Sequence, residues 1–206
     1  MGHDSHPEFV TLHALRIKGF APVPTIAEMA ALPETEVHTH LSGFQASGHV
    51  QFREQRGLWQ LTPAGRAVHL ERLADDVGAA RAIDRLAELY EPFLQHNDEF
   101  KQLCTDWQLR DGAPNDHTDA DYDRDVIERL DTLHGSASPV VCSLAEILRR
   151  LGPYAPRLDQ VLRRVVDGET NMFTGVMCGS YHDVWMELHE DLILTQGIDR
   201  SAEGSF

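Results

Sequence analysis

Residues 35–48, TEVHTHLSGFQASG, combine a helical apolar stripe with a face of small polar side chains. Val37, Leu41 and Phe44 recur at the i, i+4, i+7 spacing of one face of an α-helix. The other face carries hydrogen-bonding groups: His38, Thr39, His40, Ser42, Gln45 and Ser47. Such side chains can hydrogen-bond to base edges in the major groove of DNA. The stretch has no Lys or Arg, so attraction for phosphate must come from elsewhere in the chain.

The segment after this helix alternates in the manner of a β-hairpin. VQFRE (50–54) places Val50 and Phe52 on one side, and LWQLT (58–62) supplies a second strand after the turn. Arg53 and Arg56 lie on this hairpin. We therefore expect the polar helix to contact bases and the two hairpin arginines to hold the DNA backbone or minor groove.

The elements around this pair follow a recognisable order. A helix is expected over 8–19, and the prolines of APVP keep the next residues extended. TIAEMAAL (25–32) reads as a second helix with Thr25 and Glu28 as a capping box, and Thr35 is the expected N-cap of the third. Thr62 as N-cap with Pro63 at the first helical position begins the helix after the hairpin. This order predicts a winged helix-turn-helix.

The run VHTHLSGFQASGHVQFREQRGLWQLTPAGR resembles the recognition helix, wing and exit of MarR-like bacterial transcriptional regulators. The resemblance covers about residues 8–75, and the small residues before Val50 and the sequence LTPAGR carry it. It implies a regulator that binds double-stranded DNA through His38, Thr39, His40, Ser42, Gln45, Arg53 and Arg56. The alternative is a protein-interaction or accessory module whose winged helix no longer binds DNA, because winged helices serve both purposes.

The rest of the chain reads as helical, which gives a mainly α fold. A winged helix-turn-helix domain over 1–75 is followed by an all-helical domain over 76–206 that would supply dimerisation, effector binding or both. Pro92 should kink or restart its helix, and no strand pattern follows residue 62. Helices are expected at about 121–134, 140–151, 155–167 and 179–195, separated by HGSASP, GPYAP and DGETN.

Clustered aromatic and polar residues in the helical part suggest a pocket for a small-molecule effector. Trp107, Tyr181 and Trp185 are expected to lie near one another, with polar groups at the rim. The candidate pocket set is Trp107, Arg110, Tyr181, His182, Trp185 and His189. The plainer alternatives are an amphipathic helix over 181–192, and a Trp107 at the core edge covered by Arg110.

Neither a metal site nor an enzymatic activity is predicted. The acidic run from Asp119 to Asp125 fails as a calcium loop, because its sixth position is Arg124 and its twelfth is Leu130. Its aspartates are expected to cap the next helix, with a weak cation site as the alternative. His182 and His189 are seven residues apart, too far for one ion. No cofactor motif occurs, and a metal-dependent enzyme is the weakest of the functions considered.

Charge and cysteine content indicate which part of the chain would bind DNA and in which compartment the protein would work. The 206 residues carry a net charge of −15. Residues 1–75 hold six basic and eight acidic groups, whereas 76–206 hold twelve and twenty-five, so DNA would be bound by the first third. The three cysteines are widely spaced, which favours a reducing cytoplasm over a disulfide framework. The sequence shows neither a membrane span nor a signal peptide, and a homodimer is expected.

Overall fold

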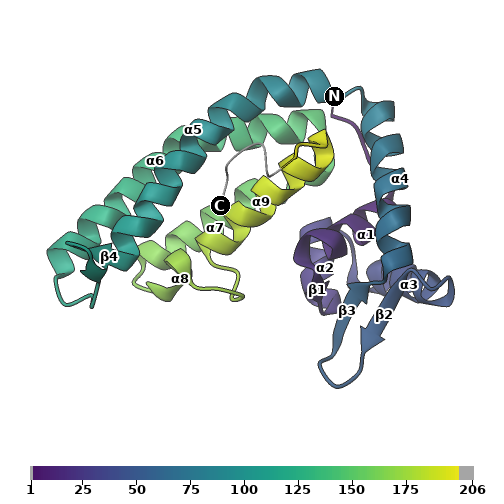
Figure 1. The fold of residues 1–206 in the computed structure, drawn as a ribbon, viewed down its shortest axis with the longest axis horizontal. Helices are drawn as coiled ribbons and strands as arrows, with labels where there is room; N and C mark the ends of the chain where they lie inside the picture. The colour runs from purple at the N-terminus through teal and green to yellow at the C-terminus, as the bar shows by residue number, and fades with distance from the viewer. Residues whose placement is uncertain (1, 200–206) are drawn as a thin grey trace.

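The computed structural model describes residues 2–199, which are mainly helical with a small antiparallel sheet. The chain forms an arch (Figure 1). The first limb holds the first helices and the sheet, and the other, called the helical limb, holds α5 to α9. The helices are α1 (Pro7–Lys18), α2 (Val23–Ala30), α3 (Glu34–Ala46), α4 (Pro63–Ala80), α5 (Ile83–Gln108), α6 (Ala120–Ile147), α7 (Tyr154–Val166), α8 (Asn171–Thr174) and α9 (Tyr181–Gln196), with a 3₁₀ turn η1 (Arg149–Leu151). The strands are β1 (Phe20–Ala21), β2 (Val50–Arg53), β3 (Leu58–Leu61), β4 (Leu109–Arg110) and β5 (Ala113–Pro114).

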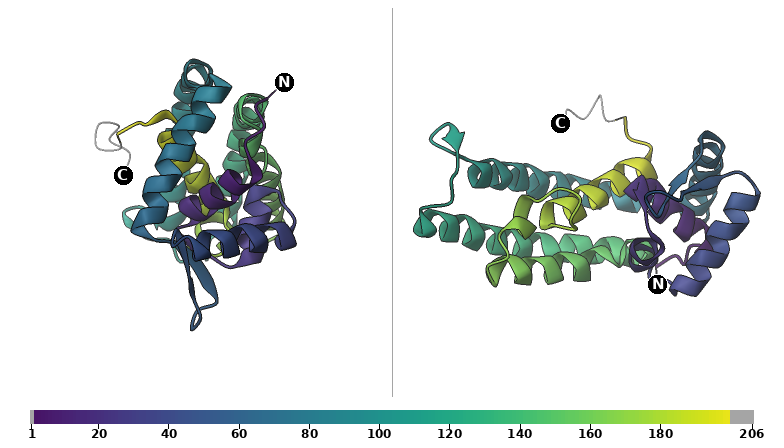
Figure 2. Two further views of the ribbon diagram at one scale, coloured as in Figure 1. Left: turned by 90° about the vertical axis from the view of Figure 1, so that its right-hand side faces the viewer. Right: turned by 90° about the horizontal axis from the view of Figure 1, so that it is seen from below.

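The three-stranded sheet has the order β1-β3-β2, with all neighbours antiparallel. Val50 pairs with Leu61 and Phe52 with Trp59, as the alternating sequence predicts. Val50, Trp59 and Leu61 are buried on the face that packs against α1 and α3. The β2–β3 hairpin projects from the first limb, as two further views of the ribbon also show (Figure 2).

Helix α4 begins as the sequence predicts. The Thr62 hydroxyl accepts a hydrogen bond from the Gly65 N–H at 3.0 Å, and Pro63 occupies the first turn. The same hydroxyl lies 2.7 Å from the Gly48 carbonyl oxygen, to which it donates. Thr62 therefore fixes the start of α4 and ties it to the end of α3.

The expected caps of α2 and α3 were wrong. Helix α2 begins at Val23, two residues before Thr25, and α3 begins at Glu34, one residue before Thr35. Neither threonine caps its helix, because Pro22 and Pro33 occupy the N-cap positions. A proline presets φ at a value that suits entry into a helix, so here each helix starts directly after a proline.

The predicted breaks in the helical limb were also partly wrong. Helix α5 continues through Pro92, and α6 continues through HGSASP, with Pro139 inside it. The two long helices pack against each other, and buried Ala137 and Val141 hold the proline-containing turn in place. A short β4–β5 hairpin, which the sequence did not indicate, joins them. None of the helices within residues 2–199 is long and apolar enough to cross a membrane.

Candidate nucleic-acid interface

Helix α3 presents a polar face to solvent and buries its apolar stripe. Val37 and Leu41 are fully buried and Phe44 nearly so, which fixes the rotation of the helix against α1 and α2. The exposed side chains on the opposite face include His38, Thr39, Ser42 and Gln45. The spacing of the apolar residues thus decides which polar groups can meet a ligand.

His40 lies on the inner side of α3, contrary to expectation. Its Nδ1 lies 2.9 Å from the Oγ1 of Thr11 on α1, and its side chain is 13% exposed. The imidazole is committed to packing α3 against α1. His40 therefore does not belong to the exposed polar face of α3.

The hydroxyls of Thr39 and Ser42 on the outer face have already used their donor hydrogens. Thr39 donates to the Thr35 carbonyl at 2.8 Å, and Ser42 donates to the His38 carbonyl at 2.8 Å. Each hydroxyl oxygen keeps lone pairs to accept with. Donors to a base edge would come from Gln45 and His38, so the face offers both kinds of group.

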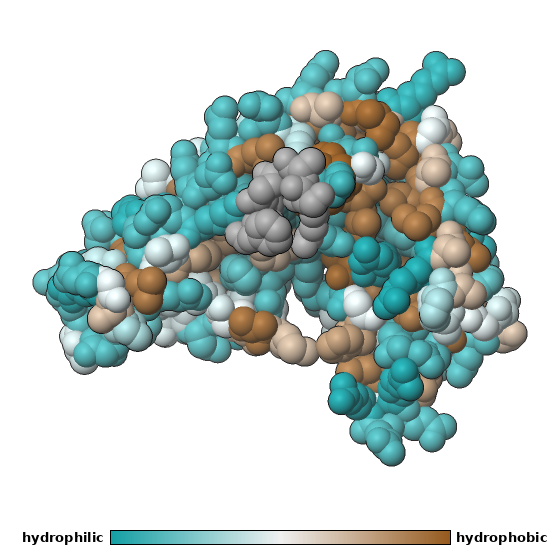
Figure 3. Space-filling model, in the orientation of Figure 1, coloured by the Kyte–Doolittle hydropathy of each residue, from teal (hydrophilic) through white to brown (hydrophobic). Residues whose placement is uncertain are grey.

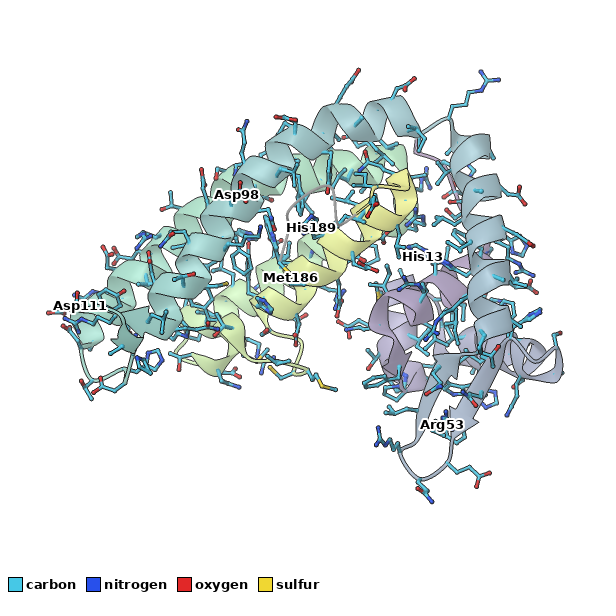
Figure 4. The ribbon with its side chains drawn as sticks, in the orientation of Figure 1. His13, Arg53, Asp98, Asp111, Met186 and His189 are labelled. Carbon is cyan, nitrogen blue, oxygen red and sulfur yellow. The ribbon has the colours of Figure 1, made fainter. Side chains whose placement is uncertain are left out.

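The hairpin arginines are free of internal ion pairs among the described residues. Arg53 ends β2 opposite Leu58, on the outer face of the sheet, and Arg56 lies in the turn. Figure 4 shows Arg53 at the hairpin, away from the helical limb. Both cations are exposed and available to an anionic partner. Exposed Glu54 lies between them in the sequence and partly offsets their charge.

A third exposed cation, Arg66, was missed in the sequence. It lies in the first turn of α4, where its N–H bonds to the Thr62 carbonyl at 3.0 Å. Because Thr62 is tied to Gly48, this turn lies beside the end of α3. At the opposite end of α3, its first turn holds two acidic residues, Glu34 and Glu36. The sequence LTPAGR predicts that a helix starts at Pro63, and this start would have placed Arg66 in the first turn.

The predicted effector pocket is packed core. The rings of Tyr181 and Trp185 are 6.1 Å apart and fully buried, and the cavity beside them measures about 10 Å³. A space of that size holds no organic ligand. His189 is buried 5.4 Å from the Phe93 ring, and the His182 ring lies 6.3 Å from that of Phe100.

The remaining two pocket residues lie apart from that cluster. Trp107 is buried and packs at 5.0 Å from the ring of Phe173 and 4.5 Å from that of His117. Arg110 lies over the ring of Tyr122 at 4.8 Å and pairs with Asp119 at 2.8 Å. The expected grouping of three aromatics is therefore corrected to two separate clusters. Asp119 caps α6, as predicted, by accepting two backbone N–H bonds.

A buried ionic cluster, not foreseen from the sequence, joins the two limbs. Arg150 of η1 donates to Asp191 of α9 at 2.6 Å, and its Nε lies 3.5 Å from Asp76 of α4. His13 of α1 lies 2.9 Å from Asp191 through Nε2 and 2.9 Å from His69 through Nδ1. Figure 4 shows His13 on the side of α1 that faces the helical limb. The cluster is closed to solvent, so its role is to fix the limbs together.

The electrostatics of this cluster follow from burial and pairing. Burial lowers the pKa of His69 to about 3 and also lowers the pKa of His13. Burial alone would raise the pKa of Asp191, but Arg150 and His13 hold it below its ordinary value. The cluster therefore holds two neutral imidazoles beside an ionised carboxylate at neutral pH.

Comparisons with known proteins add no relatives: no family model matches the chain, and neither the curated proteins nor the solved structures yield a significant match. Within residues 2–199, no group of three or more His, Cys, Asp or Glu side chains could hold a metal ion.

Proposed function

We propose that this protein is a DNA-binding transcriptional regulator, with a winged helix-turn-helix domain over 1–75 and a helical dimerisation domain over 76–206. The observation that carries the proposal is the exposed polar face of α3 beside a projecting hairpin whose two arginines have no ion-pair partner within residues 2–199. The element order α1-β1-α2-α3-β2-β3, with β1 on the edge of the hairpin sheet, supports the same reading.

In this proposal α3 enters the major groove and the hairpin follows the backbone. Gln45 and His38 would read base edges, while Thr39 and Ser42 would accept hydrogen bonds from base amino groups. Phosphate attraction would come from Arg53 and Arg56. With so few cations, each module should bind random DNA weakly, and the logarithm of its affinity should fall by about two for each tenfold rise in salt.

The test is fluorescence anisotropy with random duplex DNA and with the protein's own promoter region, at low salt. Replacing Arg53 and Arg56 together by alanine should abolish binding. The matched control replaces exposed Arg85 and Arg163, which removes the same charge from the helical limb and should leave binding intact. Replacing His38 and Gln45 should reduce preference for the promoter more than affinity for random DNA.

A second candidate, a protein-interaction module, is favoured by one specific observation. Helix α3 carries Glu34 and Glu36 but neither Lys nor Arg, within a chain of net charge −15. If the intact protein binds neither duplex at low salt, the regulator proposal fails and this alternative takes its place.

A further inference from the structure

A groove of about 800 Å³ runs between the two limbs. One wall comes from α1, β1 and α2, and the other from α7, α9 and the segment before α9. The space-filling view shows a notch between the limbs on this side of the molecule (Figure 3). The volume lies in the range of ligand sites in proteins. Its walls include the buried core residues Ala21, Val161 and Val184, but neither Tyr181 nor Trp185.

Arg157 of α7 lines the groove with unused hydrogen-bonding capacity. Its side chain is 10% exposed, and its Nη2 donates to Glu187 at 2.7 Å. Its Nε lies 3.7 Å from Glu28, beyond hydrogen-bond distance, and its buried Nη1 has no hydrogen-bond partner in the part of the chain that the structure describes. A largely buried guanidinium whose N–H groups lack acceptors is costly, and a ligand acceptor at Nε would reduce that cost.

Most acidic side chains of the groove are already matched. Glu187 pairs with both Lys18 and Arg157. Asp183 accepts the backbone N–H groups of Cys178 and Gly179 at 2.9 Å each. Glu28 is the loosely held one, because it is 62% exposed and only near Arg157. Glu28 therefore competes for Arg157 with any anion that enters the groove, and such an anion would displace it.

Alongside polar and charged side chains such as Gln160, Arg164 and Glu190, the groove has an apolar part that can adapt to a ligand. Met177 stands at its lip, 77% exposed, on a residue with a left-handed φ of 60°. Methionine is flexible and accommodates ligands of varied shape. The apolar lining includes Ile17, Phe20, Val161, Met177, Val184 and Met186. A flexible aliphatic chain suits this lining better than a rigid polar molecule.

We propose that this groove binds an aliphatic carboxylate, with the carboxylate on Arg157 and the chain directed along Met186 towards Met177. The carboxylate accepts a hydrogen bond from the Nε of Arg157, in the place beside that atom where Glu28 now lies. The bound chain touches both limbs and so fixes their relative position. The site goes beyond the DNA-binding proposal and does not depend on it, and its test uses no DNA.

The first experiment measures binding of decanoate to the full-length protein by calorimetry, below the concentration at which micelles form. Decanol and decylamine serve as probes with the same chain and a different head group. Decanoate should bind at least about tenfold more tightly than either, since a hydrogen bond to a charged group contributes on that order. Equal binding of decanoate and decanol would overturn the proposal, and tighter binding of decylamine would show a cation site instead.

The second experiment tests the assigned residues. Arg157→Gln should weaken decanoate binding about tenfold or more and leave decanol unchanged. Arg157→Lys, which keeps the charge and the fold but loses the planar fork, should also weaken it. Glu28→Gln should strengthen decanoate binding several-fold because the competitor is gone.

The lip offers a matched pair of exposed residues. Met177→Ser should weaken decanoate binding, whereas Val176→Ser should not, because Val176 is 74% exposed but does not line the groove. Folding of every variant is checked by circular dichroism. The proposal falls if folded Arg157 variants bind decanoate as the unchanged protein does, or if Glu28→Gln loosens it.

Discussion

Gly65 marks the closest approach of helix α4 to the segment after α3. A Cβ added there would lie 1.8 Å from the carbonyl oxygen of His49, far inside van der Waals contact. We expect Gly65→Ala to lower the free energy of unfolding by about 2 kcal/mol or more, because backbone must move to admit the methyl group. Chemical denaturation monitored by circular dichroism measures the change.

A second glycine in the same helix provides the control. Gly78 is exposed, and an added Cβ would meet nothing within 4 Å. Gly78→Ala should therefore raise the free energy of unfolding by about 0.5–1 kcal/mol. A Gly65→Ala variant as stable as Gly78→Ala would contradict the packing described here.

The buried histidines predict how stability depends on pH. His69 and His13 are neutral in the folded protein, because burial lowers the pKa of both and brings that of His69 to about 3. In the unfolded chain both take up protons near pH 6.5, the ordinary pKa of histidine. The unfolded state then binds more protons below pH 6.5, so stability should fall as the pH is lowered. Between its folded and unfolded pKa values His69 contributes about 1.4 kcal/mol per pH unit, and His13 adds to the slope in the same direction.

The measurement is the free energy of unfolding between about pH 6.5 and 5.5, above the range where aspartates and glutamates take up protons. His69→Gln should reduce the slope by about one histidine's share, whereas replacing exposed His38 by Gln should leave it unchanged. A His69→Gln slope equal to that of the unchanged protein would show that His69 is charged in the fold.

At the scale of elements, the cap of α4 and the false cap of α2 make a contrasting pair. Thr62→Ala removes a hydroxyl that caps Gly65 and binds Gly48, so it should cost about 1–2 kcal/mol of unfolding free energy. Thr25→Ala alters a residue inside α2 that caps nothing, so its effect should stay within about 0.5 kcal/mol. Thermal unfolding of the two variants compares them directly. If both variants lose the same unfolding free energy, Thr25 caps α2 after all, contrary to the structure.

Local patterns predicted the elements well where the determining contacts are local. The hairpin strands, the start of α4 and the buried stripe of α3 follow from alternation, a cap and helical spacing. Helix α5 does not restart at Pro92 and α6 does not break at HGSASP, because packing between α5 and α6 outweighs the local preference of Gly135 and Pro139.

The parts of the site that the sequence did not reveal depend on contacts between distant residues. Arg150 binds Asp191, 41 positions away, and His13, 137 positions away, and no local spacing encodes such pairs. His40 was misplaced because Thr11, its partner, comes from another helix. Arg157 lies in an amphipathic helix and looks like an ordinary surface arginine until its fold buries it.

At the scale of the whole molecule, we expect a homodimer held mainly by the helical limb. Large apolar side chains remain exposed after residue 63: Leu70, Ile83, Leu109, Val166, Val176 and Met177. The net charge of −15 opposes self-association, so salt should strengthen the dimer while it weakens DNA binding. Light scattering at micromolar concentration, at about 50 and 300 mM salt, measures the mass. A monomer under both conditions would rule out the dimer.

The buried ionic cluster should make the two limbs unfold as one unit. Arg150 connects Asp191 in the helical limb with Asp76 in α4, and His13 extends the cluster into α1. Replacing Arg150 by Met leaves buried carboxylates without their partner, which should cost about 3–5 kcal/mol. Because the cluster is shared, we expect the loss to appear equally in both limbs.

Tryptophan fluorescence can follow the limbs separately. Trp59 lies in the sheet, while Trp107 and Trp185 lie in the helical limb, so Trp59→Phe leaves reporters in the helical limb alone. Replacing Trp107 and Trp185 by Phe leaves the sheet reporter. In each background Arg150→Met should shift the denaturation midpoint by a similar amount, and exposed Arg163→Met should shift neither. A shift confined to one reporter would mean that the limbs fold independently and that the cluster belongs to only one of them.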